Sequence, residues 1–172
     1  LGLAAQECAR HGASLSTDWQ EVEIMGYEKL LQRLLRNLLQ NAKRYGQNNS
    51  RCGEEFGLSA PVALQADKTA SDVELHISRD PHTGDWILDI LDRGAGVPPA
   101  LREKIFEPFF RLPTVAEREG GVGLGLALVR SIAQHHGGQV QCLAREGGGA
   151  CFRVTLPASD GKPFLTSSAQ HA

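Results

Sequence analysis

The chain has 172 residues, enough for one domain with a full hydrophobic core, and its 41% hydrophobic and 22% charged content is typical of a globular protein. Its net charge of −2 argues against a nucleic-acid-binding surface, and no basic run suggests direct contact with a membrane. No apolar stretch is long enough to span a bilayer. The first residue is Leu1 rather than Met, so we expect the chain to be part of a longer protein.

Two helices are predicted in the first part of the chain. Residues 3–12 predict a short helix that ends at Gly12, and residues 13–25 predict one or two strands. Residues 28–45 predict a long helix that Gly46 ends. Its apolar residues share one face, at the helical spacing i, i+3, i+4, i+7, i+8 and i+11: Leu31, Leu34, Leu35, Leu38, Leu39 and Ala42.

A long polar loop follows over residues 46–72, with or without one edge strand in "APVALQ". Residues 73–78 alternate between apolar and polar and predict a half-buried strand. A turn joins this strand to "WILDILD", residues 86–92, so the two predict a β-hairpin. Residues 98–106, "PPALREKIF", predict a short helix with proline at its start.

The last part of the chain predicts a second long helix over residues 124–136, closed by Gly137 and Gly138. Residues 139–146 and 150–157 predict a second hairpin, and the small polar residues from 158 onward predict a disordered tail. Long helices beside antiparallel hairpins predict an α/β (α+β) two-layer sandwich, in which helices cover one face of the sheet.

A polar stripe runs beside the leucines of the first long helix. Asn37, Asn41 and Arg44 fall within about 60° of one another around the helix axis, and Tyr45 lies at the edge of the apolar face. Asn is a poor helix former, and a solvated face would ordinarily use Glu, Lys or Gln. The stripe is either such a solvated face or a site where an amide oxygen ligates Mg²⁺, Arg44 contacts phosphate and Tyr45 stacks on a ring.

Asp92 shares a strand face with Leu88 and Ile90. If that face packs on the helices, the carboxylate is buried and requires a hydrogen-bond donor. Gly94 and Gly96 follow and allow close approach of the backbone, so the amino group of an adenine is one candidate donor. The alternative is an Asp that only begins a turn.

The glycines at the start of the second long helix predict an anion site, because a helix N-terminus offers unpaired N–H groups and the positive end of a dipole. The stretch is neither a P-loop nor a dinucleotide fingerprint. Upstream, Phe106, Phe109 and Phe110 predict a hydrophobic plug under a loop, and the adjacent Arg111 is placed to reach a phosphate.

Four motifs in this order resemble those of a known family. "NLLQNAKRYG", "DRGAGVP", "FEPFFR" and "GGVGLGLALV" resemble the N box, first glycine box, F box and second glycine box of sensor histidine kinases. The resemblance covers residues 12–157 and concerns the catalytic ATP-binding domain of two-component systems, within the superfamily of gyrase, mismatch-repair ATPases and ninety-kilodalton chaperones. It implies a Bergerat-type fold, a mixed, mostly antiparallel sheet under helices, with ATP held between the helices and a mobile lid.

The resemblance also implies a role for each matching position. Asn41 would ligate Mg²⁺, Asp92 would read the adenine, and Asn37, Arg44 and Arg111 would serve catalysis. The residues placed against ATP are Asn41, Arg44, Tyr45, Asp92, Gly94, Gly96, Val97, Arg111, Gly121, Val122, Gly123, Leu124, Gly125 and Leu126. Residues 112–120 would form the lid, while the aliphatic side chains of Leu124, Leu128 and Ile132 are expected in the core.

Asn37 decides between a kinase and a hydrolase. In the clamp ATPases of the superfamily a Glu at this position activates water, and an Asn cannot act as a general base. The resemblance therefore implies phosphoryl transfer to a histidine on a separate dimerisation domain, which would in turn serve a response-regulator receiver domain. The alternatives are a nucleotide-switched interaction module and an anti-sigma-type protein serine kinase, against which the phenylalanine box argues.

None of the six histidines of this chain lies in a phosphoacceptor pattern. His135 and His136 are expected to act as a helix cap and as partners of the helix dipole. The resemblance implies a cytoplasmic domain of an inner-membrane sensor, spanning residues 1–157 with 46–72 as a loop insertion and 158–172 as the tail. One departure from the family pattern is Tyr27, where an Asp is expected before the long helix.

Overall fold

The computed structural model of the chain describes residues 2–17, 24, 26–46, 73–112 and 122–158. The predicted insertion after Gly46, most of the predicted lid and the tail from 159 lie outside these ranges. The described elements are α1 (Gly2–His11), β1 (Ser14–Thr17), α2 (Glu28–Gly46), β2 (Val73–Arg79), β3 (Trp86–Asp92), the 3₁₀ turns η1 (Pro99–Leu101) and η2 (Lys104–Phe106), α3 (Gly125–His135), β4 (Gln139–Ala144) and β5 (Ala150–Leu156).

The described strands form one five-stranded sheet in the order β1-β2-β3-β5-β4. β1 pairs with β2 in parallel, and the other three pairings are antiparallel, so the sheet is mixed and mostly antiparallel, as predicted. Both predicted hairpins are confirmed: β2 pairs with β3, and β4 pairs with β5. In the β2–β3 turn, the Asp80 carboxylate accepts hydrogen bonds from the backbone N–H groups of His82 and Thr83.

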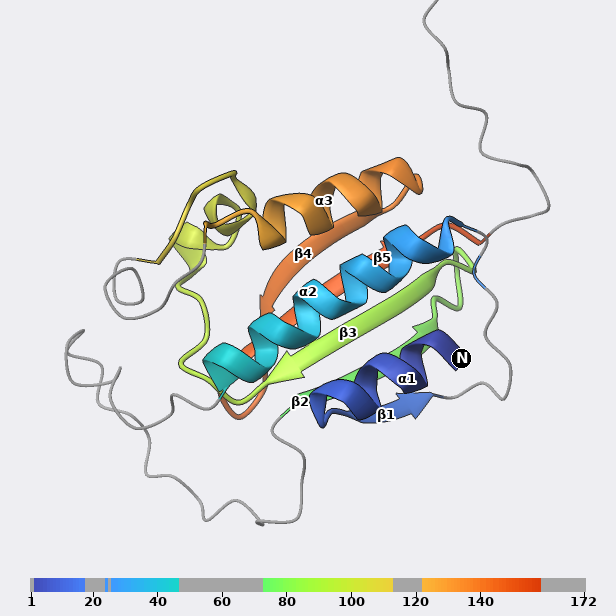
Figure 1. Cartoon of the computed structure of the whole chain (residues 1–172), viewed down its shortest axis with the longest axis horizontal. Coiled ribbons are helices and arrows are strands. Elements are labelled where there is room, and N and C mark those ends of the chain that lie inside the picture. Colours follow the sequence, from blue (N-terminus) through green and yellow to red (C-terminus); the bar gives the residue numbers. More distant parts are fainter. Residues whose placement is uncertain (1, 18–23, 25, 47–72, 113–121, 159–172) are drawn as a thin grey trace, which may run out of the picture.

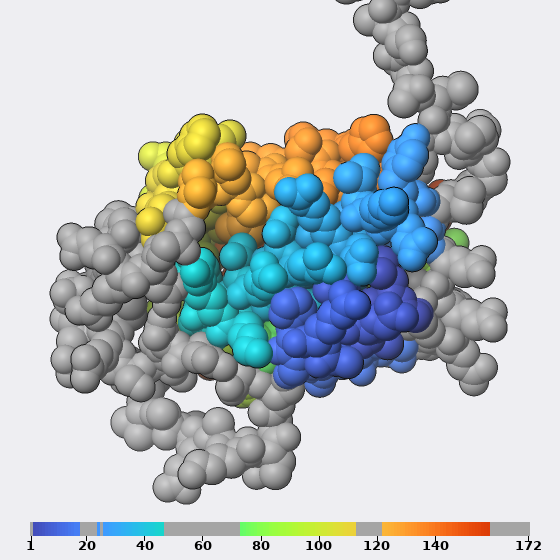
Figure 2. Space-filling view, viewed as in Figure 1, coloured from blue at the N-terminus to red at the C-terminus, as the bar shows by residue number. Residues whose placement is uncertain are grey.

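The three helices cover one face of this sheet, which confirms the predicted two-layer sandwich (Figure 1). α2 runs along the middle of the helical layer, between α1 and α3, and the three together form the surface of this face (Figure 2). No helix in the described ranges has the length and apolar character needed to cross a membrane.

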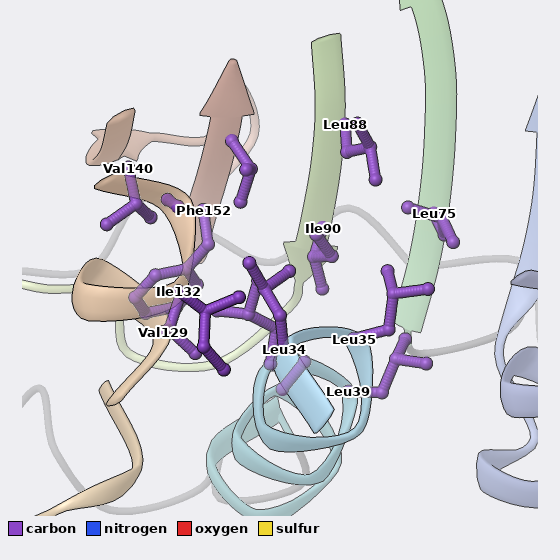
Figure 3. Close-up of a cluster of buried hydrophobic side chains, with 14 of the residues drawn as sticks. Leu34, Leu35, Leu39, Leu75, Leu88, Ile90, Val129, Ile132, Val140 and Phe152 are labelled. Carbon is purple, nitrogen blue, oxygen red and sulfur yellow. The ribbon is translucent and has the colours of Figure 1, made fainter. Parts of the chain in front are cut away.

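The hydrophobic core lies between the two layers (Figure 3). The apolar stripe of α2 faces the sheet, where Leu34, Leu35 and Leu39 lie over Leu75 of β2 and Ile90 of β3. Each fully buried side chain of this kind contributes roughly 1.5–3 kcal/mol relative to an exposed one. The leucine spacing that predicted the helix therefore also predicted the face that fixes it to the sheet.

The predicted short helix over residues 98–106 is confirmed in part: the segment is helical and begins with proline, but it forms two short 3₁₀ helices, η1 and η2, rather than one continuous helix. Pro99 suits the first position of a helix, where the N–H has no intrahelical acceptor, but Pro108 follows two residues after η2 and limits any helix that starts here. The stretch between these prolines is too short to offset the unfavourable nucleation of an α-helix.

His136 joins the C-terminal end of α3 to the residue before α2. Its imidazole is 1% exposed, its Nε2 accepts a hydrogen bond from the Tyr27 backbone N–H at 3.1 Å, and its Nδ1 lies 2.8 Å from the Ile132 carbonyl oxygen. The backbone N–H of His136 also caps α3, as expected.

A buried carboxylate joins α1 to α2. Glu7 is fully buried, and its Oε1 accepts hydrogen bonds from Gln32 at 3.0 Å, Arg36 at 3.3 Å and Arg10 at 3.0 Å. Burial raises the pKa of Glu7, but the hydrogen bonds and charges of Arg36 and its neighbours outweigh this and lower the pKa below its ordinary value. Glu7 is therefore an ionised anchor between the two helices.

Candidate functional site

The C-terminal end of α2, the segment after β3 and the N-terminal end of α3 lie at the same end of the molecule (Figure 1, left). Gly94 packs directly on the end of α2, since a Cβ at this position would lie 3.0 Å from the carbonyl carbon of Tyr45 and closer still to its oxygen. The Phe109 backbone N–H donates a 2.9 Å hydrogen bond to the Gly123 carbonyl. These contacts join the four motif segments in two pairs, the first glycine box with the N box and the F box with the second glycine box.

Asp92 is the buried charged group of this region. It is 3% exposed, and its Oδ1 accepts hydrogen bonds from the backbone N–H groups of Gly94 at 2.9 Å and Ala150 at 3.2 Å. Burial raises the pKa of Asp92, and the two backbone hydrogen bonds and the charge of Arg145 only partly compensate. Both hydrogen bonds go to Oδ1, which leaves Oδ2 to accept from a ligand.

The sequence left open which face of β3 is buried, and the structure buries the face that carries Asp92, Leu88 and Ile90. Two donors to Asp92 come from the protein itself. Ala150 was not predicted as part of the site, and neither was Arg145, whose NH1 donates a 3.0 Å hydrogen bond to the Asp92 carbonyl oxygen. Both lie in the β4–β5 hairpin, which meets Asp92 through the pairing of β3 with β5. The sequence predicts the β4–β5 hairpin, but no local pattern indicates that the hairpin pairs with β3.

Close backbone packing surrounds Asp92. A Cβ at Gly149 would overlap the Asp92 carbonyl group, and a Cβ at Gly96 would lie 2.9 Å from the Gly149 carbonyl oxygen. Gly94 and Gly96, predicted to shape a ligand pocket, thus also fit the chain against α2 and the β4–β5 turn. Val97 is half-buried, and its carbonyl accepts a 3.1 Å hydrogen bond from Arg102 Nε.

The polar stripe of α2 reaches this end of the molecule. Asn37, Asn41 and Tyr45 are half-buried and Arg44 is exposed. Among the described residues, the Nδ2 of Asn37 is a buried donor without a hydrogen-bond partner. A buried polar group is ordinarily hydrogen-bonded, so this amide fits a site that a polar ligand completes.

The N-terminal end of α3 carries no side-chain cap, so its first N–H groups are left for another acceptor. A Cβ added at Gly125, the first residue of α3, would meet no atom within 4 Å, so packing within the described residues does not require glycine there. Gly123, by contrast, has φ +74° and touches the Phe109 backbone. An anion seated at Gly125 would use the open space.

The remaining predicted residues are placed as follows. Arg111 is half-buried at the end of the described segment, and Gly121 lies outside the described residues. Val122 is 68% exposed and Leu124 is 44% exposed, whereas Leu126 packs partly against the core. The expectation that Leu124 belongs to the core is wrong, because this residue precedes the first turn of α3 as its N-cap and its side chain is exposed.

Comparison with known proteins places residues 26–160 in the family described as histidine kinase-, DNA gyrase B- and HSP90-like ATPases. Sensor protein KdpD of Escherichia coli is 36% identical over 131 residues, which are 74% of this chain and 12% of KdpD. Sensor protein CutS of Streptomyces coelicolor is 34% identical over 154 residues, 88% of this chain and 31% of CutS. The chain thus spans less than a third of the length of these relatives.

Solved structures share the fold. Full-length ShkA in complex with AMPPNP superposes with a TM-score of 0.63 at 25% identity, over 91% of this chain and 29% of ShkA. The mycobacterial sensor histidine kinase MprB superposes with a TM-score of 0.61 at 22% identity, over 91% of this chain and 92% of the MprB chain. With its two-layer sandwich, its four ordered motifs and the family match over residues 26–160, the chain belongs to the histidine kinase-, DNA gyrase B- and HSP90-like ATPases.

Proposed function

We propose that this chain binds Mg·ATP and transfers the γ-phosphate to a histidine on a separate dimerisation domain of its parent protein. The observation that carries the proposal is Asp92, a buried carboxylate with one oxygen occupied by backbone donors and the other left for a ligand. An adenine amino group is a donor of the required kind. The uncapped N-terminus of α3 and the open space at Gly125 suit the phosphates of the same ligand.

Each predicted residue has a proposed part in this site. Asn41 would hold Mg²⁺ through its amide oxygen, and the metal would neutralise charge on the phosphates. Tyr45 would lie along the base or ribose next to Gly94, and Arg44 and Arg111 would contact the phosphates. The remaining ATP contacts are proposed at Gly96, Val97, Gly121, Val122, Gly123, Leu124 and Leu126.

Asn37 supports transfer rather than hydrolysis. Its partnerless Nδ2 can donate to a phosphate or to a water in the metal's shell, but an amide cannot remove a proton from an attacking water. Phosphoryl transfer depends mainly on positioning and on charge stabilisation, which these residues supply. The acceptor histidine and its acid–base neighbours would then belong to the partner domain.

The proposed partners follow from the same mechanism. The acceptor is a dimerisation histidine domain of the parent, and the phosphoryl group would pass from it to a response-regulator receiver domain. The proposed parent is a sensor protein in the inner membrane that carries this domain on its cytoplasmic side.

The test is a transfer assay in trans with γ-labelled ATP, Mg²⁺ and a supplied dimerisation segment that carries an acceptor histidine. We expect Mg²⁺-dependent ATP binding, little turnover by the chain alone and an acid-labile label on the segment. Asn41→Asp and Asp92→Ala should each abolish labelling, while Arg153→Gln, on the opposite face of the sheet, should preserve it. ATP binding without any labelling would overturn the kinase proposal in favour of a nucleotide-switched module, and an acid-stable label would indicate serine chemistry.

A further inference from the structure

We propose that Arg145 and Glu74 are positioning residues for adenine recognition, which hold the main chain at Asp92 so that its carboxylate meets the amino group of the base. The inference rests on the proposed function, because it concerns the same carboxylate. Neither residue touches the ligand in this scheme. Both lie outside the four motifs.

Arg145 connects the β4–β5 turn to two other strands. Its side chain is 10% exposed, its NH1 donates a 3.0 Å hydrogen bond to the Asp92 carbonyl oxygen, and its NH2 donates a 2.6 Å hydrogen bond to Glu74 Oε1. The second is a charge-assisted bond between groups that are both largely removed from water, where such bonds are strongest. A single guanidinium thus ties the end of β3 to β2 and to the turn.

Glu74 accepts hydrogen bonds from two arginines close to the main chain of Asp92. It lies on β2, opposite Leu91, on the sheet face away from the helices. The same Oε1 accepts a 3.2 Å hydrogen bond from Arg93 NH2, the residue after Asp92. Burial raises the pKa of Glu74, but the bonds and charges of Arg145 and Arg93 outweigh this and lower it, so Glu74 is ionised.

This network fixes the geometry of the base-reading carboxylate. Arg145 begins the turn whose other end supplies the Ala150 N–H to Asp92 Oδ1 at 3.2 Å, and Gly149 packs against the Asp92 carbonyl. Without the hydrogen bond from Arg145 to that carbonyl, the distance between the Ala150 N–H and the Asp92 carboxylate is no longer fixed by the turn. Oδ2 then no longer has one defined direction toward the base.

The chain offers a matched control for a purely structural ion pair. Arg153 of β5 donates to both oxygens of Asp89 on β3, at 2.8 and 2.7 Å, and this pair also lies on the sheet face away from the helices. It joins β5 to β3 without donating to Asp92. Arg153→Gln should therefore reproduce the general effect of losing an ion pair and nothing more.

The experiment compares binding of ATP with binding of purine riboside triphosphate, which lacks the amino group, by calorimetry. In the unmodified chain we expect ATP to bind more tightly than the analogue. The dissociation constant of the analogue divided by that of ATP, the discrimination ratio, therefore reports the contact of Asp92 with the amino group. Arg145→Gln should lower this ratio about tenfold, the scale of one hydrogen bond to a charged group. Glu74→Gln should lower it in the same direction, and Arg153→Gln should leave it unchanged.

The outcomes separate the two proposals. If the unmodified chain does not bind ATP, or does not distinguish it from the analogue, the proposed function of Asp92 fails and this inference fails with it. If the unmodified chain discriminates and both Arg145→Gln and Glu74→Gln keep the full ratio, only the positioning role is overturned. Should Arg145→Gln fail to fold, the ratio measured for Glu74→Gln decides in the same way.

Discussion

The carboxylate of Asp92 is held in an environment that does not favour its charge. Its pKa is raised by burial, against the opposing effect of the Gly94 and Ala150 N–H groups. Groups that serve a binding site often lie in such unfavourable surroundings, because the missing interaction is supplied by the ligand. In this domain the missing interaction would be the donor at Oδ2.

A direct consequence concerns stability without nucleotide. The folded state binds the Asp92 proton more tightly than the unfolded chain, so the stability contribution is present below the ordinary aspartate pKa of 3.8 and is lost as pH rises through the pKa of the folded state. Asp92→Asn cannot ionise, so it avoids this loss of stability at neutral pH, and its amide oxygen can still accept from the two N–H groups. We expect its melting temperature at neutral pH to rise by about 2–4 °C, measured without ligand.

The same variant should lose nucleotide binding, because an amide presents a donor where the carboxylate presents an acceptor. Calorimetry with Mg·ATP would measure this. A less stable Asp92→Asn domain at neutral pH, or one that still binds ATP fully, would contradict the environment described for Asp92.

Residues named by short motifs or by strand alternation could be predicted from the sequence. Alternation placed Asp92 with Leu88 and Ile90 on one face, and the structure shows that this face is buried. Arg145 and Ala150 could not be predicted, because they meet Asp92 only through the pairing of β3 with β5, 53 and 58 residues away along the chain. Contacts over such separations depend on strand order, which local patterns do not encode.

At the scale of elements, the junction between the F box and α3 depends on two glycines in different ways. Gly123→Ala would place a Cβ 2.9 Å from the Phe109 carbonyl carbon in a residue with φ +74°, so we expect the free energy of unfolding to fall by about 1–3 kcal/mol. Chemical denaturation would measure this change. Unchanged stability in Gly123→Ala would contradict the close packing.

Gly125→Ala is the matched variant with the opposite expectation. The added Cβ meets open space and alanine favours a helix, so stability should be unchanged or higher by up to about 1 kcal/mol. Affinity for Mg·ATP should nevertheless fall, because the methyl group enters the space proposed for phosphate. Full affinity in this variant would show that phosphate does not lie against Gly125.

The contact of α1 with α2 should depend on pH. Because the pKa of Glu7 is lowered in the folded protein, its contribution to stability is present above the ordinary glutamate pKa of 4.5 and is lost as pH falls through the pKa of the folded state. Glu7→Gln should lower the free energy of unfolding by about 1–2 kcal/mol at neutral pH and have little effect in strong acid. Denaturation curves across this pH range would test it, and an equal effect at every pH would contradict it.

The sequence predicted the type of a secondary-structure element best where the periodic pattern of apolar residues was long. α2 was predicted within one residue of its observed end, since its leucines repeat over several turns. The 3₁₀ turns at 99–106 were predicted as a helix because composition alone does not measure how much nucleation costs in a short segment between prolines. Leu124 was assigned to the core because an aliphatic run does not reveal where the first helical turn begins.

For the molecule as a whole, α2 and α3 are joined at one end and available to a ligand at the other. His136 bridges the C-terminal end of α3 to Tyr27 before α2, far along the helices from Gly125 and Tyr45 (Figure 1). We expect His136→Ala to lower the free energy of unfolding by about 2–3 kcal/mol, because a buried, doubly hydrogen-bonded side chain is removed. His135→Ala, at an exposed neighbouring ring, should change it by less than about 0.5 kcal/mol.

Thermal and chemical denaturation of the two histidine variants would make this comparison. Equal effects of the two would contradict the bridge. The resemblance predicted the overall sandwich and the sheet. It could not predict the bridge, because the group that donates to His136 is the backbone N–H of Tyr27, which the identity of the Tyr27 side chain does not reveal.

The hydrogen bond from Ala150 to Asp92 has a consequence for mutational mapping of the domain. An alanine scan removes side chains, and this donor is a main-chain N–H on a residue that is already alanine and is 2% exposed. Such a scan would therefore report Asp92 and, under our proposal, Arg145 and Glu74, but not the N–H of Ala150. Ala150→Pro would delete the N–H itself, and backbone amide-to-ester replacement at position 150 would do so without altering any side chain. Part of the preference of this domain for adenine would then depend on a backbone N–H group, which substitution of side chains alone would not detect.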